Sequence, residues 1–278
     1  MQSNLKKLIG NSNVWLYGDK LYTDRLEMKS PYKTKQCLLF TAEQFGMFND
    51  DTTIEGAVAV IKSKKTKLEI PGQVIENPVF PDFSGEPIDI KMPWIQDFVC
   101  SAKEFFIDKT YCATPATNAI TYIKQTNPIS AIVSAEFVEV CKMLGSFKLI
   151  YKTNSSMTVV GKDIKVNFPI INSEITYASV EAILESEEKV GAVLIPAETM
   201  QAIAKLPSKT ETIKFIDNKA VVQSTTMNFV GEIQSKGTVD AAVLLASIDC
   251  SREKFIITTN AIKYKIADNI YKIVPLVG

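Results

Sequence analysis

Two stretches of the chain repeat the same order of hydrophobic and polar positions. Residues 131–168 and 193–233 each begin with a short β-branched run, continue into an amphipathic segment and end in three further alternating runs. From Phe137 to Leu144 the apolar residues fall at i, i+3, i+4 and i+7, and the second stretch follows nearly the same spacing from Met200. This spacing gives a helix one apolar face. The pattern predicts a strand, a helix and three strands in each stretch.

The ends of these predicted helices carry typical start signals. Ser134 and Pro196 stand where a capping hydroxyl or a first-turn proline belongs. Asn154–Ser156 and Asp217–Lys219 stand between predicted strands, where hairpin turns belong.

The same unit recurs more weakly elsewhere, and the short strands Val14–Tyr17 and Leu21–Thr23, separated by Gly18-Asp19, belong to one such copy. Six helix starts are predicted, near Ser3, Thr41, Pro93, Ser134, Pro196 and Thr238. Their spacing alternates between short and long, which groups six units into three pairs. We therefore expect an α+β fold of three tandem domains, each a doubled β-α-β-β-β unit. The expected ranges are 1–85, 86–173, a linker at 174–189, and 190–278.

The composition argues against an enzyme. The 278 residues include 31 basic and 31 acidic side chains and no histidine, the commonest general base and metal ligand. The chain has no phosphate-binding glycine loop, and the Ser-x-x-Lys matches at Ser3 and Ser30 lack companion motifs. Asp50-Asp51 and Glu187-Glu188 lack the ligand spacing of a cation site. We expect no catalytic residues, metal or cofactor.

Cysteine usage and hydropathy bear on localisation. The five cysteines are scattered and odd in number, which favours free thiols in a reducing compartment. Neither a signal peptide nor an apolar run long enough to span a membrane is visible. We expect a soluble protein of the cytoplasm, or of a phage-infected cytoplasm.

The doubled units resemble those of the beta-subunit sliding clamp of bacterial DNA polymerase. The resemblance rests on the half-domain at Leu194–Ile233, on Ile88–Pro93 as the start of a middle domain, and on Ile270–Val277 as a C-terminal strand. It implies a homodimeric ring with helices lining the hole and sheets outside, which encircles duplex DNA and tethers a polymerase. The chain departs from the family in its short first domain and in its neutral net charge.

The resemblance also implies two kinds of binding site. Lysines on or beside the helices would contact DNA phosphates: Lys6, Lys7, Lys103, Lys142, Lys205, Lys209 and Lys254. An apolar pocket between the middle and last domains would bind short linear peptides of the polymerase and the clamp loader. Its matching residues are Phe168, Pro169, Ile170, Ile171, Val274, Pro275, Leu276 and Val277.

Three other interpretations stay open at this stage. A two-domain clamp would close as a trimer and leave one unit, most plausibly the first, as an accessory segment. A viral structural or assembly protein would need no lysines on its helices. A clamp-like decoy of host replication proteins would keep the fold without the replication role.

Overall fold

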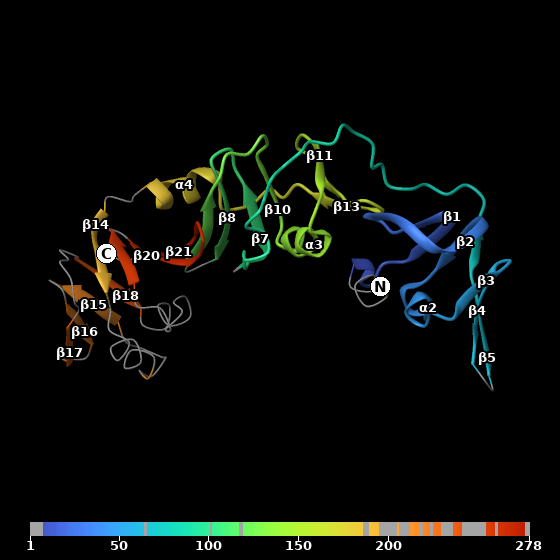
Figure 1. The fold of residues 1–278 in the computed structure, drawn as a ribbon, viewed down its shortest axis with the longest axis horizontal. Coiled ribbons are helices and arrows are strands. Elements are labelled where there is room, and N and C mark those ends of the chain that lie inside the picture. Colours follow the sequence, from blue (N-terminus) through green and yellow to red (C-terminus); the bar gives the residue numbers. More distant parts are fainter. Residues whose placement is uncertain are drawn as a thin grey trace. The chain divides into compact units, whose positions relative to one another are not determined.

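A computed structural model describes residues 8–63, 66–100, 102–116, 119–185, 189–194, 205, 212–216, 219–222, 225–228, 236–240, 254–258 and 261–275. The chain divides into two compact units. Unit 1 contains Met1–Lys91 and Glu139–Ile170, and unit 2 contains Met92–Val138 and Ile171–Gly278. Strands predominate among the described residues, and the helices there are short (Figure 1).

Unit 1 contains two antiparallel sheets. The larger has the order β1-β2-β13-β12-β11, with β6 also paired to β2. Its strands are β1 (Val14–Tyr22), β2 (Leu26–Phe40), β6 (Gln73–Ile75), β11 (Lys148–Lys152), β12 (Ser156–Val160) and β13 (Ile164–Pro169). The smaller contains β3 (Thr52–Glu55), β4 (Val58–Lys62) and β5 (Lys67–Pro71).

The hairpin strands predicted after residue 147 are confirmed as β11, β12 and β13. Asn154 has φ 56° in the turn between β11 and β12, a left-handed conformation that asparagine tolerates better than most residues. The expected break at Gly18-Asp19 is wrong, because β1 runs through it as one strand. Its pairing with β2 shifts register on both sides of Gly18, whose φ is +64°. The glycine therefore marks a bulge rather than a turn.

The helix predicted at Thr41 is confirmed as α2 (Ala42–Gly46). The Thr41 hydroxyl accepts the Gln44 N–H, and the Gln44 side chain accepts the Thr41 N–H, which forms a capping box. Phe45 and Phe48 pack with ring centroids 4.8 Å apart, and Phe48 meets Phe40 of β2 edge-on at 5.0 Å. The short helix therefore packs on the sheet through aromatic contacts.

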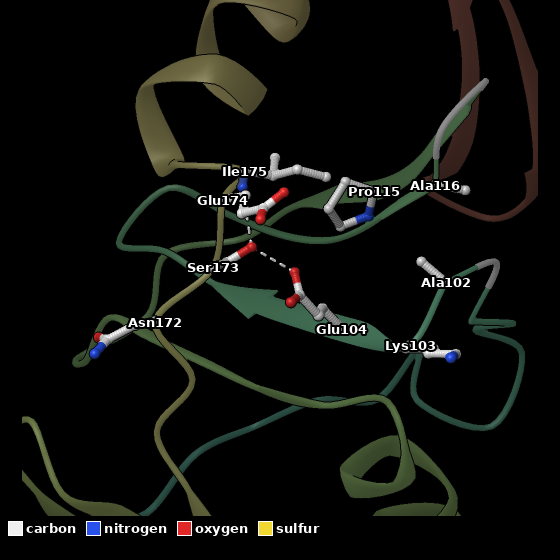
Figure 2. Close-up of a pocket in the computed structure, with 9 residues that line it drawn as sticks. All are labelled: Ala102, Lys103, Glu104, Pro115, Ala116, Asn172, Ser173, Glu174 and Ile175. Carbon is white, nitrogen blue, oxygen red and sulfur yellow. Dashed lines mark hydrogen bonds between the residues drawn. The ribbon is translucent and has the colours of Figure 1, made fainter.

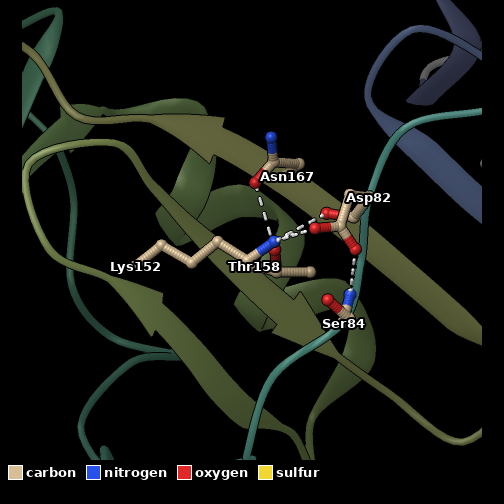
Figure 3. A network of polar contacts seen from close by, with 5 residues as sticks. All are labelled: Asp82, Ser84, Lys152, Thr158 and Asn167. Carbon is tan, nitrogen blue, oxygen red and sulfur yellow. Dashed lines mark hydrogen bonds and ion pairs between the residues drawn. The ribbon is translucent and has the colours of Figure 1, made fainter.

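Residues 82–89 form a strap along the outer edge of β11. Ile88 and Leu149 exchange two backbone hydrogen bonds, of 2.6 and 2.9 Å. At one end Lys152 donates to the Asp82 carboxylate at 2.7 Å (Figure 3). At the other end Lys148 pairs with Asp89 at 3.1 Å. The strap thus covers hydrogen-bonding groups that an open strand edge would expose.

Unit 2 contains an eight-stranded and a four-stranded antiparallel sheet. The larger has the order β10-β7-β8-β9-β21-β20-β19-β14, and the smaller β17-β16-β15-β18. Strands of the larger sheet are β7 (Glu104–Ile107), β8 (Tyr111–Ala116), β9 (Ala119–Lys124), β10 (Ala131–Ser134), β14 (Lys189–Leu194), β19 (Lys254–Thr258), β20 (Ala261–Ala267) and β21 (Ile270–Pro275). Those of the smaller are β15 (Thr212–Ile216), β16 (Lys219–Val222), β17 (Thr225–Asn228) and β18 (Lys236–Asp240).

The helix predicted to start near Pro93 is wrong. Residues 93–97 form turns with hydrogen bonds between residues three apart, and β7 follows at Glu104. Trp94 and Phe98 are both buried, and Phe98 meets Phe105 edge-on at 5.5 Å. The apolar spacing that suggested a helix therefore serves the packing of large rings into the sheet, and tertiary packing outweighs a short helical pattern.

The stretch expected to be a linker contains a helix, α4 (Tyr177–Glu185), which the sequence analysis did not predict. Val180 and Leu184 are buried against a cluster of the large sheet that includes Phe106 and Ile120. Figure 1 shows α4 beside β8. The Tyr111 hydroxyl donates to a carbonyl of α4, and burial raises the pKa of Tyr111, so this hydroxyl stays protonated.

Of the remaining predictions, one helix is confirmed, and the others fall mainly on residues that the structure does not describe. The helix predicted from Ser134 is α3 (Glu136–Leu144), in which Phe137, Val140 and Cys141 are buried. The helices predicted near Ser3 and Pro196 lie mainly outside the described residues, as does the one near Thr238, where the described residues belong instead to β18. The strand predicted at 229–233 also lies outside them. Domain boundaries at 85, 173 and 189 stay a prediction.

Candidate peptide and DNA contact sites

Four of the seven lysines expected to contact DNA are described. Lys103 is exposed immediately before β7, and Lys205 is exposed in a turn. Lys254 is the first residue of β19, and Lys142 belongs to α3. Lys6, Lys7 and Lys209 lie outside the described residues.

Charge on the exposed face of α3 is mixed. Its outward positions include Glu139, Lys142 and Met143, with Phe137, Val140 and Cys141 on the buried side. The ammonium of Lys142 lies 3.2 Å from the Glu139 carboxylate, and the two side chains are 21% and 64% exposed. Because the pair is close, Glu139 offsets much of the attraction that Lys142 would exert on a phosphate.

The residues expected to form the peptide pocket differ in exposure. Phe168 is 1% exposed and Val274 is 0% exposed, so both belong to hydrophobic cores. Pro169 is exposed, whereas Ile170 and Ile171 are half-buried. Leu276 and Val277 lie outside the described residues, and Pro275 is the last residue of β21. The two buried residues can support a pocket wall but offer little surface to a ligand.

Unit 2 has a shallow pocket that begins directly after Ile171. Its volume is about 570 Å³, and Figure 2 shows the residues that line it. They are Ala102, Lys103, Glu104, Pro115, Ala116, Asn172, Ser173, Glu174 and Ile175. One predicted DNA-contact residue, Lys103, thus lies in the same pocket as the segment that continues the predicted peptide site.

A hydrogen-bond relay fixes one wall of this pocket. The Ser173 hydroxyl donates to the Glu104 carboxylate at 2.6 Å and accepts the Ile175 N–H at 3.1 Å (Figure 2). The backbone of Ile171 donates to Ile132 of β10 at 2.8 Å. These contacts anchor residues 171–175 to β7 and β10, so the wall is held by strands rather than by a free loop.

Sequence reasoning missed Glu104, Pro115 and Ser173 as lining residues. Glu104 precedes a run of buried aromatic residues and looks like an ordinary strand end. Pro115 provides the one visible signal, because proline is rare in a central strand. Pro115 is the second-to-last residue of β8 and lies opposite Ile120 of β9.

The chain matches solved structures in its fold, whereas comparison of its sequence with family models and curated proteins finds no match. No protein-family model and no curated protein matches the chain. The beta clamp of Helicobacter pylori bound to a DNA ligase peptide aligns with a TM-score of 0.66 at 13% identity, covering 100% of this chain and 98% of that one. The beta subunit of Streptococcus pyogenes DNA polymerase aligns with a TM-score of 0.68 at 10% identity, covering 98% and 92%. That of Pseudomonas aeruginosa DNA polymerase III gives 0.65 at 8%, covering 98% and 93%.

The chain has the fold of a bacterial beta clamp. At these identities the likeness concerns the backbone and does not transfer a binding residue. In this clamp fold, most described residues belong to strands, and fewer than three full domains are evident. No described helix is long and apolar enough to cross a membrane. Among the described residues, no three His, Cys, Asp or Glu side chains gather as a metal site would require.

Proposed function

We propose that this chain is a DNA sliding clamp without catalytic activity. The observation that carries the proposal is the alignment of the whole chain with nearly whole beta-clamp chains. Two copies would close head to tail into a ring of six domains, with three tandem domains in each chain. A ring tethers its partner topologically, so that polymerase rebinding becomes an intramolecular event at high effective concentration.

In this proposal, lysine side chains of the protein contact the phosphates of the DNA. The seven lysines named above would face the duplex, in contacts that do not depend on sequence and therefore permit sliding. The Glu139–Lys142 pair provides a test of orientation. If α3 faces DNA, replacing Glu139 by alanine removes a repelling carboxylate beside Lys142, so duplex affinity should rise and the salt dependence should steepen.

The peptide partner is proposed on two grounds. The Helicobacter pylori clamp binds a DNA ligase peptide. In this chain, the segment expected to line the peptide site leads directly into the anchored wall of the unit 2 pocket. We propose that polymerase and loader peptides bind at residues 168–171 and 274–277, with the 171–175 wall beside them.

The decisive experiment measures topological retention. The protein would be loaded with a clamp loader, or at high concentration, onto nicked circular duplex DNA, and bound protein would be followed by gel filtration before and after linearisation. A clamp stays on the circle and leaves the linear product. Equal retention on both forms would contradict encirclement and leave only ordinary DNA binding.

Solution mass tests the ring itself. Light scattering at several concentrations, with imaging of the same sample, should give twice the 30.8 kDa chain mass and a particle with a central hole. A trimeric ring would retain the function but overturn the three-domain count. A compact monomer would refute the ring.

A further inference from the structure

The β1–β2 ribbon of unit 1 presents one face rich in lysine. Positions 29, 31, 33 and 35 of β2 are exposed, whereas 30 and 32 are buried, so Lys29, Lys33 and Lys35 share the exposed face. Lys29 is directly opposite Lys20 of β1. In the same sheet, Lys165 of β13 is directly opposite Glu27, which lies two residues from Lys29. We call these five lysines, with Lys162 in the adjoining turn, the lysine face.

Four residues of the lysine face, Lys20, Lys29, Lys162 and Lys165, line a depression of about 320 Å³ in unit 1. Its lining residues include Asp19, Lys20, Glu27, Lys29, Lys162, Asp163 and Lys165. Within the lysine face and this depression, six lysines thus face three carboxylates. Glu27 is already engaged, because Lys20 lies 2.9 Å and Lys165 lies 3.4 Å from its carboxylate. The excess of positive charge is local and is hidden by the neutral total of the chain.

Three lysines of this face have no counter-charge in the part of the chain that the structure describes. Among the described residues, no ion pair engages Lys29, Lys33 or Lys35. Alternate residues of one strand are roughly 6.8 Å apart, so neighbouring lysines can each meet a separate phosphate of an extended polyanion.

An aromatic stack lies on the same face. Tyr22 is directly opposite Glu27, and its ring stacks on Phe80 with centroids 4.0 Å apart. Phe80 in turn stacks with Tyr17 at 6.0 Å, and Tyr17 is 46% exposed. Tyr17 is therefore a partly exposed ring supported by Phe80, which itself stacks on Tyr22, and it offers a surface on which a flat group can stack.

We propose that the lysine face and Tyr17 bind single-stranded nucleic acid. Lysines that form no ion pair among the described residues stand here beside a supported aromatic ring. This is the chemistry that non-specific single-strand binders use, with lysines for the phosphates and rings for the bases. A duplex keeps its bases stacked inside, so it would engage only the lysines. An acidic peptide would likewise use the charges but not the ring. The site lies on a sheet face of unit 1 and includes none of the seven lysines proposed to contact duplex DNA.

Fluorescence anisotropy of the full chain with a fluorescein-labelled oligodeoxythymidine of about 20 nucleotides tests this proposal. Lys33→Glu/Lys35→Glu should weaken binding at least tenfold at low salt. It should also make the slope of log affinity against log salt about 1.4 less steep, because each phosphate contact on a single strand contributes about 0.7. Lys109→Glu/Lys124→Glu is the matched control, since both lysines are exposed in unit 2 and the net charge changes equally. It should leave binding unchanged.

The role of the ring is tested separately. Tyr17→Ala should weaken binding about tenfold without altering the salt slope, while Tyr17→Phe should retain it. If the two charge-reversed proteins bind equally, the lysine face is not the site. If Tyr17→Ala binds normally and polyglutamate displaces the oligonucleotide, the face binds acidic chains in general and the proposal is wrong. Retention on circular duplex is measured independently, so failure of the clamp function and failure of this site are distinguishable.

Discussion

The relay that holds the unit 2 pocket wall allows a quantitative prediction. Ser173→Ala removes the donor to Glu104 and the acceptor for the Ile175 N–H. A hydrogen bond to a charged acceptor contributes about 1.5–3 kcal/mol when enclosed, but both side chains are half-buried, so we take about 1 kcal/mol. The backbone contact adds about 0.5–1 kcal/mol. The expected loss of unfolding free energy is about 1.5–2 kcal/mol, or a Tm lower by about 3–8 °C in the transition that reports unit 2.

A double-mutant cycle separates this relay from general loosening of the segment. Glu104→Gln keeps an acceptor but removes its charge, so alone it should cost about 0.5–1 kcal/mol. In the Ser173→Ala background it should cost almost nothing, giving a coupling of about 0.5–1 kcal/mol. Thermal and urea unfolding followed by fluorescence would measure all four proteins.

Thr176→Ala provides the matched control for this cycle. The Thr176 hydroxyl accepts the Ser179 N–H at 3.3 Å at the start of α4, so its loss should cost about 1 kcal/mol as a helix cap. It does not touch Glu104, and its effect should add to that of Glu104→Gln. If Ser173→Ala and Glu104→Gln are also additive, the short contact between them contributes nothing specific and the reasoning is refuted.

Three further predictions concern packing and the strap. Phe105→Ala, at a fully buried ring, should lower the unfolding free energy by about 3–5 kcal/mol in denaturant titrations; an effect below about 1 kcal/mol would contradict the packing described. Gly85→Ala should destabilise unit 1 by about 1–3 kcal/mol, because Gly85 has φ +142° and an added Cβ would meet Ile150; equal stability would show that the strap can shift. The Lys152 ammonium holds the pKa of Asp82 well below its ordinary value of 3.8. The attachment is therefore fully present at neutral pH, weakens as the pH falls below 3.8 and is lost as the pH falls through the lowered pKa. Protease cleavage within the strap should accelerate in acid. In the Asp82→Asn variant the strap should be cleaved rapidly at every pH.

Sequence pattern predicted best where local and tertiary signals agree. The helix from Glu136 and the hairpins that follow it combine helical spacing, strand alternation and a turn asparagine, and the structure has them all. The helix prediction at 93–98 failed because the apolar spacing there suits either a helix or a set of aromatic rings inserted into a core. Only the tertiary fold decides between these two structures. Helix α4 was missed because its apolar residues lie in a stretch rich in acidic side chains.

The pocket could not be predicted from local pattern. Glu104 and Ser173 are 69 residues apart in the sequence and meet only because residues 171–175 run past β7. The strap was hidden for a similar reason, since Asp82 and Lys152 are separated by 70 residues and look like ordinary surface charges. Pairwise contacts at such separations leave no periodicity in the chain.

Net charge is a poor guide to the partners of this fold, because charge is distributed unequally over its elements. The exposed face of α3 combines Glu139 with Lys142, so this helix provides little net attraction for DNA. The ribbon face of unit 1 carries Lys29, Lys33 and Lys35, which form no ion pair with any residue that the structure describes. Attraction for a polyanion depends on such local excess rather than on the total. If binding of a single strand and retention on circular duplex respond to different lysines, the neutral chain contains two separate electrostatic surfaces. If Lys33→Glu/Lys35→Glu abolishes both, one surface serves both roles and the helices cannot be the main DNA contact.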